Sequence, residues 1–445
     1  MPGFSILTYF AAQYCVNYLM TKLYKSTNTA ESIVGWLSVI CCIGMIAGMF
    51  CSRVLLSSSM LVLFICSLLP SKMATNWQAW RSNKFAIFSF LFFLAYLMSG
   101  FWSEDKDFWL ASATNKLPFA VLPFAFLAAP LHKEKYQRAI ILGIILLQLI
   151  VVGNSMLQLA LHTDFYLQGY HLSHPLPTTK YGDHIRFSLT LVMTILLSFY
   201  LLFEKHRNPL SVWFKILLWI NILISILFIH ILAAKTGIMC LYIMASIYAM
   251  AKLWRRNKVI ALTVVAAIIA LPLIAYRTIP TFKTKIDYVF YEIAKSKQDQ
   301  RYDYTLSDAG RMITYDIGGK AILNHPWVGV GAGDVMIEMK KGYAKDYPEV
   351  AANQHYGPIN QFMFTALSIG LPLTLLLVGL TISSFMGKIR WRLYLVLTSL
   401  VMLASIMVES MLELQFGVFT YLFFILFWMS ALRQTPATKI DASIT

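Results

Sequence analysis

The chain has 445 residues, of which 58% are hydrophobic and 13% are charged, and it carries a formal net charge of +16. This composition lies outside the range of ordinary soluble domains and predicts a protein embedded in lipid. The basic balance alone would allow a nucleic-acid partner, but no segment of the chain forms a basic domain, so we expect none.

Apolar stretches recur along the whole chain, each long enough to cross a hydrocarbon core of about 30 Å as a helix. The pattern predicts an all-α polytopic membrane protein with about twelve transmembrane helices. The predicted spans are residues 32–50, 54–70, 85–100, 117–130, 139–161, 186–203, 214–232, 236–251, 259–276, 359–383, 393–409 and 416–432.

The distribution of charge predicts the orientation of these spans. If the N-terminus is cytoplasmic, the cytoplasmic segments contain 20 basic and four acidic residues, whereas the short outer segments contain six basic and seven acidic residues. Cytoplasmic loops of membrane proteins carry the excess of Lys and Arg, so we expect both termini in the cytoplasm. The same basic excess is suited to contact with the anionic heads of membrane lipids.

The spans divide the chain into three predicted parts. Residues 1–276 form an N-terminal transmembrane bundle of about nine spans, residues 277–358 an outer loop, and residues 359–445 about three further spans with a cytoplasmic tail. A connection as long as this loop is usually functional in a compact protein. We therefore expect the chemistry of the protein on the outer side.

The outer loop is predicted to contain a helix that ends near Asn324, because Pro326 and a run of glycines follow. The run Gly329-x-Gly331-x-Gly333 follows no predicted strand, so it is a weak candidate for a nucleotide-binding motif. The preferred interpretation is a tight backbone turn.

Three cations on the predicted outer side are candidate binding residues. Arg186 opens the sixth span, Lys235 lies between two spans, and Arg311 begins the predicted loop helix. The side chain of a lone arginine at a span end often extends to the polar membrane interface and has no binding role. Three such cations on a side with few other basic residues favour an anion-binding site, because a charge near hydrocarbon is costly.

A metal site is the alternative use of the outer polar residues. His171, His174, Asp183 and His184 have side chains suited to zinc. The prolines between them make the loop irregular, and nothing fixes a tetrahedral geometry. We therefore expect no metal and no other cofactor.

Two acidic groups have open roles. The run from Glu104 to Asp107 is interpreted as a solvated hairpin. Glu409 and Glu413 are one turn apart and would share a face if the helix continues there. They either bind substrate or face water.

Several of these residues together resemble the O-antigen ligase and polymerase superfamily. Arg311-x-x-x-Tyr315 is followed by Asn324-His325-Pro326-Trp327-Val328-Gly329-Val330-Gly331 and then by Asn360-Gln361-Phe362 and Gly370. The turn at Lys235-Thr236-Gly237, and Lys116-Leu117-Pro118 with Pro123, are similar to two further features of that family. The resemblance extends over about residues 100 to 430.

The resemblance implies a metal-independent, inverting glycosyltransferase of the bacterial inner membrane, with its active site on the periplasmic face. Its donor would be a glycan linked to undecaprenyl diphosphate. A ligase passes this glycan to a hydroxyl of the lipid A core in lipopolysaccharide biosynthesis, and a polymerase passes it to another glycan; we favour the ligase. A flippase for the same lipids is the alternative from another class, but the chain lacks the paired repeats and intramembrane charges of transporters.

The resemblance also implies roles for individual residues. Arg186, Lys235 and Arg311 match the cations that hold the diphosphate, for which guanidinium and ammonium groups are physically suited. The family places a histidine directly before the asparagine of the next span, whereas Ile359 precedes Asn360 here.

His355 lies four residues before Ile359 and is the candidate catalytic base, since a neutral imidazole can accept the proton of a sugar hydroxyl. Asn360 and Glu409 are further candidates for substrate binding.

We predict that a reporter fused after residue 300 is periplasmic and that one fused after residue 256 is cytoplasmic, because of the charge distribution. The measurement is the activity of compartment-specific reporters in cells. Cytoplasmic labelling of a cysteine introduced between residues 290 and 350 would contradict this topology.

Overall fold

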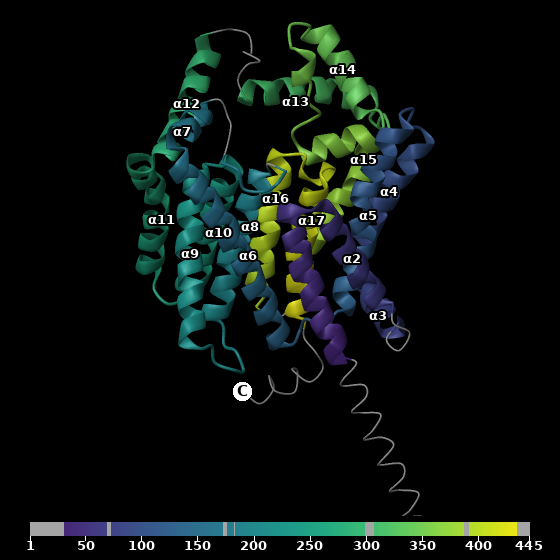
Figure 1. Ribbon diagram of the computed structural model, residues 1–445. Coiled ribbons are helices and arrows are strands. Elements are labelled where there is room, and N and C mark those ends of the chain that lie inside the picture. Colours follow the sequence, from purple (N-terminus) through teal and green to yellow (C-terminus); the bar gives the residue numbers. More distant parts are fainter. Residues whose placement is uncertain are drawn as a thin grey trace, which may run out of the picture.

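The computed structural model describes residues 31–68, 73–171, 176–181, 183–298, 307–386 and 391–433. It is a bundle of helices with several shorter helices at one end (Figure 1). In these ranges nine helices are long and apolar enough to cross a membrane, and three apolar helices are shorter. The predicted fold class, an all-α polytopic membrane protein, is confirmed.

Each of the twelve apolar helices overlaps one predicted span. The longer ones are Glu31–Cys51, α4 (Lys84–Met98, continued by the 3-10 turn Ser99–Phe101), α5 (Lys106–Ala128), α6 (Glu134–Leu161), α8 (His184–Phe203), α9 (Val212–Leu232), α10 (Lys235–Leu253), α11 (Lys258–Thr278) and α15 (Gln361–Ser384). The shorter ones are α2 (Arg53–Ser67), α16 (Arg392–Val408) and α17 (Gln415–Ala431). The other helices are α3 (Met73–Arg81), α7 (Thr163–His171), α12 (Pro280–Gln298), α13 (Ser307–Asn324) and α14 (Val335–Asp346).

The centre of the bundle is formed by α17 and α8. Every residue of α17 from Phe416 to Ala431 is buried, and α8 is buried around most of its circumference. A helix that is apolar on all sides requires neighbours on all sides, and α17 packs against α5, α8 and α16. In contrast, α11 buries only Ala261 and Ala275 and lies at the periphery (Figure 1).

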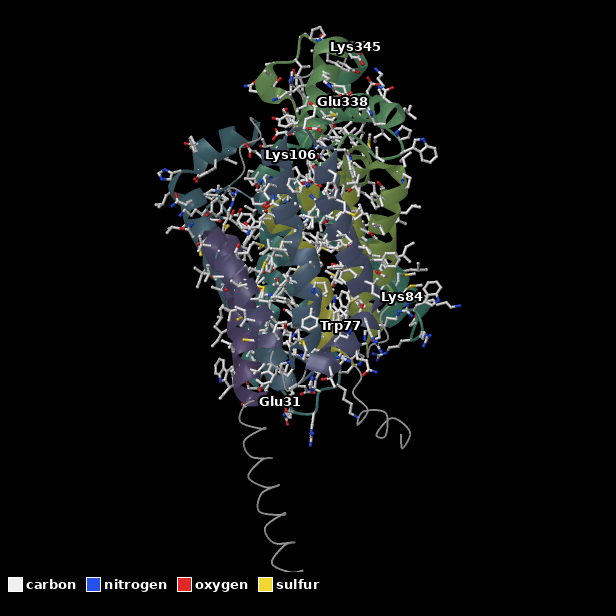
Figure 2. The ribbon with its side chains drawn as sticks, turned by 90° about the vertical axis from the view of Figure 1, so that its right-hand side faces the viewer. Glu31, Trp77, Lys84, Lys106, Glu338 and Lys345 are labelled. Atoms are coloured by element: carbon white, nitrogen blue, oxygen red, sulfur yellow. The ribbon has the colours of Figure 1, made fainter. Side chains whose placement is uncertain are left out.

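The two ends of the bundle differ in character. Glu31, Trp77 and Lys84 lie toward one end, and Lys106 and Glu338 lie toward the other (Figure 2). The second end carries α13 and α14, and we call it the loop end. If successive spans alternate in direction, four helices begin at the loop end: α2, α5, α8 and α10.

The helices α13 and α14 share a small apolar core with the start of α15, which contributes Phe364 and Leu367. Ile313 and Ile317 of α13 pack with Val335, Met339 and Tyr343 of α14. The predicted helix end at Asn324 is confirmed. The outer loop is thus a folded layer at the loop end.

The glycine run docks this layer onto a kink in α15. Gly329 and Gly331 have φ values of +70° and +98°, which confirms the predicted tight turn. Gly370 breaks α15 with φ of +84°, and a Cβ there would lie 2.2 Å from the carbonyl oxygen of Trp327. The amide of Leu371 donates to the carbonyl of Pro326 at 2.8 Å, so the loop satisfies backbone groups that the kink exposes.

The acidic run Glu104 to Asp107 covers the end of the turn before α5 and the first two residues of that helix. Its exposed Glu104 and Asp107 side chains fit a solvated turn, but the backbone is anchored: the amides of Glu104 and Asp105 donate to the Asp334 carboxylate at 2.8 and 2.9 Å. The predicted span 117–130 was placed too late, since Asp105 caps a helix that begins at Lys106.

Candidate functional site

The C-terminal end of α16 is a meeting point of four other helices. The last carbonyl groups of a helix have no partner within it. Here Arg311 Nη1 from α13 donates to the carbonyl of Val408 at 2.8 Å, and Asn360 Nδ2 donates to the carbonyl of Met407 at 2.7 Å. Two site residues predicted from the sequence are therefore bound to consecutive carbonyls.

Glu409 follows directly after α16 and links it to α8 and α10. Its Oε2 lies 3.3 Å from Arg186 Nη2 of α8, and its Oε1 accepts from Thr236 Oγ1 of α10 at 3.2 Å. Burial raises the pKa of Glu409 above its ordinary value, while the positive charges of Arg186 and Arg311 oppose the rise. The carboxylate is therefore electrostatically coupled to both arginines.

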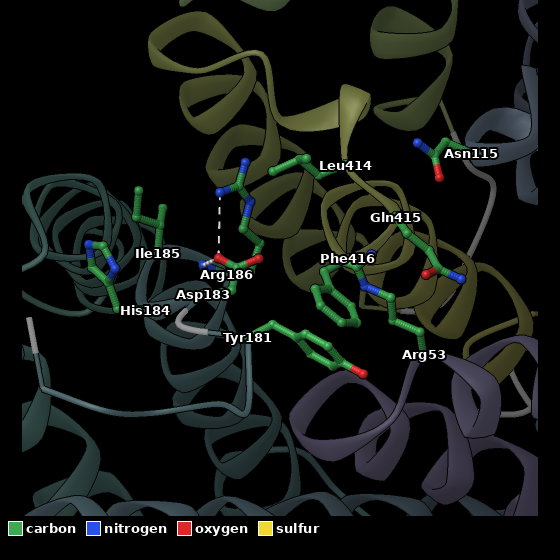
Figure 3. Close-up of a pocket in the computed structure, with 10 residues that line it drawn as sticks. All are labelled: Arg53, Asn115, Tyr181, Asp183, His184, Ile185, Arg186, Leu414, Gln415 and Phe416. Carbon is green, nitrogen blue, oxygen red and sulfur yellow. Dashed lines mark hydrogen bonds and ion pairs between the residues drawn. The ribbon is translucent and has the colours of Figure 1, made fainter. Parts of the chain in front are cut away.

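Asp183 fixes Arg186 from the other side. Its carboxylate caps α8 by accepting from the Arg186 amide at 3.1 Å, and it lies 3.4 Å from Arg186 Nη1 (Figure 3). Arg186 is 8% exposed. The guanidinium is thus held between two carboxylates with little freedom to move.

Lys235 is brought to this region by close packing of α10 on α8. A Cβ at Gly237 would lie 2.3 Å from Ser188 Oγ, so only glycine permits this approach. Lys235 is exposed and is the first residue of α10. A cation there opposes the helix dipole, whereas an anion would be favoured by both the lysine and the helix N-terminus.

Both arginines retain a buried donor without a partner. The Nε atoms of Arg186 and Arg311 are buried and make no hydrogen bond to any residue in the described ranges. An unsatisfied buried donor is costly, and more so on a charged group. A phosphate oxygen placed beside either N–H group would satisfy it.

Asn360 acts as an anchor in this structure. Its Oδ1 accepts from the amides of Phe362 and Met363 and caps α15, while its Nδ2 holds Met407. Both ends of the amide are engaged within the protein. Asn360 therefore fixes α15 to α16 beside Arg311 and Glu409.

Among the described residues, the ring contact and the hydrogen bond of the His355 side chain are both with the loop of residues 277–358. Its ring stacks on Tyr343 at 4.1 Å between centroids, and its Nε2 lies 3.0 Å from the carbonyl oxygen of Val350. A carbonyl only accepts, so Nε2 carries the proton and Nδ1 of the neutral ring carries the lone pair. The structure does not place His355 in contact with Arg186, Arg311 or Glu409.

The segment that follows His355 does approach the cluster. The carbonyl of Ile359, the residue where the family has its histidine, accepts from Tyr315 of α13 at 3.0 Å. The amide of Ile359 donates to Thr314 Oγ1 at 3.4 Å, and that hydroxyl donates to the carbonyl of Arg311 at 2.7 Å. Ile359 thus packs against α13, about one helical turn after Arg311.

A second polar network, centred on Lys116 and Glu413, was not assigned a role from the sequence. Lys116 of α5 is fully buried, and its Nζ lies 2.6 Å from Glu413 Oε2 and 4.0 Å from the centroid of the Tyr96 ring. Gln361 Nε2 donates to Glu413 Oε1 at 2.7 Å. The signal in the sequence was a lysine inside an apolar helix, which requires a partner.

The condition under which Glu409 and Glu413 would share a helix face, that the helix continues through them, is not met. The helix ends at Val408 because Glu409 adopts an extended conformation, and Glu413 lies in the separate turn η4 (Met411–Glu413). Each glutamate therefore pairs with a different cation.

A cavity of about 400 Å³ lies beside Arg186 (Figure 3). The residues that line it are Arg53, Asn115, Tyr181, Asp183, His184, Ile185, Arg186, Leu414, Gln415 and Phe416. It joins the starts of α2, α8 and α17.

The alternative metal cluster is only partly described. His174 lies outside the described residues, and the side chain of His171 is not described either. Within the described ranges no three His, Cys, Asp or Glu side chains are grouped as a metal site would require.

We predict that Lys116→Met lowers the stability of the protein by about 3–5 kcal/mol, because it leaves the Glu413 carboxylate without its buried cation. The double variant Lys116→Met, Glu413→Gln should lose less than the sum of the single changes. Thermal unfolding in detergent measures the effect, with the exposed Lys341→Met as the matched control. An unfolding midpoint of Lys116→Met equal to that of the control would contradict the prediction.

Comparison with known proteins identifies a domain in the second half of the chain. Residues 220–378 match the family model of the O-antigen ligase. The match extends from α9 into α15 and includes Lys235, Arg311, His355 and Asn360, while Arg186 and Glu409 lie outside it. No curated protein matches the chain. The chain is therefore a multi-pass membrane protein that contains a domain similar to the O-antigen ligase family.

Proposed function

We propose that this protein is an O-antigen ligase, which transfers a glycan from undecaprenyl diphosphate to a hydroxyl of the lipid A core. The reaction takes place on the periplasmic face of the bacterial inner membrane and needs no metal. The observation that carries the proposal is that Arg186 and Arg311 both act electrostatically on Glu409, and that each has a buried N–H group with no hydrogen-bond partner among the described residues. A polymerase of the same superfamily is the alternative.

The donor diphosphate binds to the cations at the end of α16. Each arginine offers a guanidinium that is already held in place, Arg186 by Asp183 and Glu409 and Arg311 by Val408. A preorganised fork binds phosphate oxygens without further loss of side-chain freedom. Lys235, exposed at the N-terminus of α10, adds a point charge.

His355 is the proposed base. Its Nδ1 accepts the proton of the acceptor hydroxyl while the hydroxyl oxygen attacks the anomeric carbon of the donor sugar. The bond from that carbon to the diphosphate breaks, and undecaprenyl diphosphate leaves with the electron pair. The cations stabilise the charge that develops on the leaving group, and one such contact is worth on the order of 10² to 10³ in rate.

The position of His355 requires a movement of its loop during the reaction. The ring is held by one stacking partner and one backbone carbonyl, both from the loop itself. Neither contact ties it to the transmembrane bundle. Binding of the acceptor over α13 would bring the ring toward the donor.

We further propose the division of labour among the three parts of the chain. The bundle of residues 1–276 supplies Arg186 and Lys235, the loop of residues 277–358 supplies Arg311 and the base, and residues 359–445 supply Glu409. Both termini lie in the cytoplasm.

We predict that Arg311→Ala abolishes transfer at normal abundance in the membrane and that Arg311→Lys recovers only part, because an ammonium cannot form the bidentate fork. The assay uses purified protein in vesicles with a defined lipid-linked glycan, and either lipid A core or excess donor as acceptor. Product on the core indicates a ligase, and elongated donor indicates a polymerase. Lys320→Ala, an exposed change on the same helix, is the control and should stay active. Full activity of Arg311→Ala would reduce the anion site to a surface charge.

His355→Ala is expected to lose turnover but to retain donor binding, because the base acts on the acceptor and the diphosphate is held elsewhere. Turnover and the binding of the lipid-linked donor are measured separately. His325→Ala, an exposed histidine in the same loop, should behave like the wild type. If His355→Ala turns over at the normal rate, another group is the base.

A further inference from the structure

The cavity beside Arg186 contains a second arginine that the proposed mechanism does not use. Arg53 is the first residue of α2 and contributes one wall, and Arg186 contributes another. Tyr181 and Phe416 lie between them (Figure 3). The volume of about 400 Å³ is within the range of about 300–1,000 Å³ that is typical of small-molecule sites.

Arg53 is held by aromatic rings and not by an acid. Its guanidinium carbon lies 4.8 Å from the centroid of Tyr181 and 5.6 Å from that of Phe416. The two rings contact each other at 5.4 Å between centroids. No carboxylate of the described residues forms an ion pair with Arg53. Ring stacking occupies the face of a guanidinium and leaves its N–H edge free for hydrogen bonds.

The opposite wall offers a second unsatisfied donor. Arg186 is more than nine-tenths buried, and its Nε has no partner in the described part of the chain. Arg53 and Arg186 therefore present two cationic groups to one cavity. Only Arg186 is partly neutralised, by Asp183 and Glu409.

Amide side chains complete the lining. Asn115 is fixed by its hydrogen bond to the carbonyl of Glu413 at 3.3 Å, and Gln415 by its hydrogen bond to Ser57 at 2.8 Å. Each retains an amide oxygen that can accept from a hydroxyl group. The lining also contains the Asp183 carboxylate, whose charge is paired with Arg186, so the cation without an acidic partner is Arg53. Cations, amides and aromatic rings in one cavity match a ligand that has both a negative charge and hydroxyl groups.

We propose that this cavity is a subsite for a phosphorylated sugar, with the phosphate on Arg53 and the hydroxyl groups on Asn115 and Gln415. The assignment rests on the proposed glycan transfer, because it places the subsite directly beside the diphosphate-binding Arg186. The phosphorylated sugar belongs either to the lipid-linked donor or to the acceptor. Both share the chemistry that the cavity recognises.

The first test is a binding measurement on the full chain in detergent, with glucose 1-phosphate as the probe and glucose as the uncharged comparison. The wild type should bind glucose 1-phosphate at least tenfold more tightly than glucose. Arg53→Gln should lose this preference, and Arg53→Lys should keep part of it. Lys106→Gln removes an exposed positive charge near the start of α5, outside the cavity, and should bind like the wild type.

The second test separates the two sources of the sugar. In the transfer assay, a KM raised at least tenfold by Arg53→Gln for the donor alone assigns the subsite to the donor, and a rise for the acceptor alone assigns it to the acceptor. Unchanged probe binding and unchanged KM values in Arg53→Gln overturn the subsite, even if Arg311→Ala is inactive and the proposed function stands. Loss of probe binding in Arg53→Gln, in a protein that transfers no glycan, would instead preserve the subsite and overturn the function.

Discussion

The structure of the loop end depends on how the C-terminus of α16 is satisfied. A helix that stops at this point leaves open carbonyls and, in this chain, a buried carboxylate directly after them. Arg311 and Asn360 bind the carbonyls, while Arg186 and Thr236 bind the carboxylate of Glu409. The carbonyls at the end of α16 and the Glu409 carboxylate are buried and need hydrogen-bond partners. The residues that supply these partners bring α8, α10, α13 and α15 together at the end of α16.

The network of Lys116 and Glu413 fixes the other end of the same turn. Glu409 begins the turn between α16 and α17, and Glu413 nearly completes it. Since each glutamate pairs with a cation from a different helix, the turn is held at both ends. The residues that follow it, from Leu414 to Phe416, line the cavity beside Arg186. The fixed position of this turn thus supports both the proposed diphosphate site and the proposed sugar subsite.

Features set by local chain chemistry could be predicted from the sequence. The twelve apolar helices follow from length and hydropathy, and the end of α13 follows from Pro326. The candidate cations Arg186 and Arg311 were recognised because an outer charge near hydrocarbon requires a reason. Their arrangement around Glu409 depends on contacts between side chains of three helices. Such contacts cannot be predicted from a local sequence pattern.

Other features depend on contacts between distant segments. The start of α5 was misplaced because its first turns are polar and are stabilised by Asp334 from the outer loop. No local pattern indicates a role for Arg53, since its contacts with Tyr181 and Phe416 join three separate parts of the chain. His355 was selected by its distance from Asn360 along the sequence, whereas its ring position is set by Tyr343.

In the proposed function, the two arginines beside Glu409 hold the donor diphosphate. The most direct measurement is a structure of the full chain with an undecaprenyl-diphosphate-linked glycan bound. We expect diphosphate oxygens within hydrogen-bond distance of the Nε atoms of Arg186 and Arg311, which are buried and have no hydrogen-bond partner among the described residues. A diphosphate bound elsewhere, with both Nε atoms still unpartnered, would contradict it.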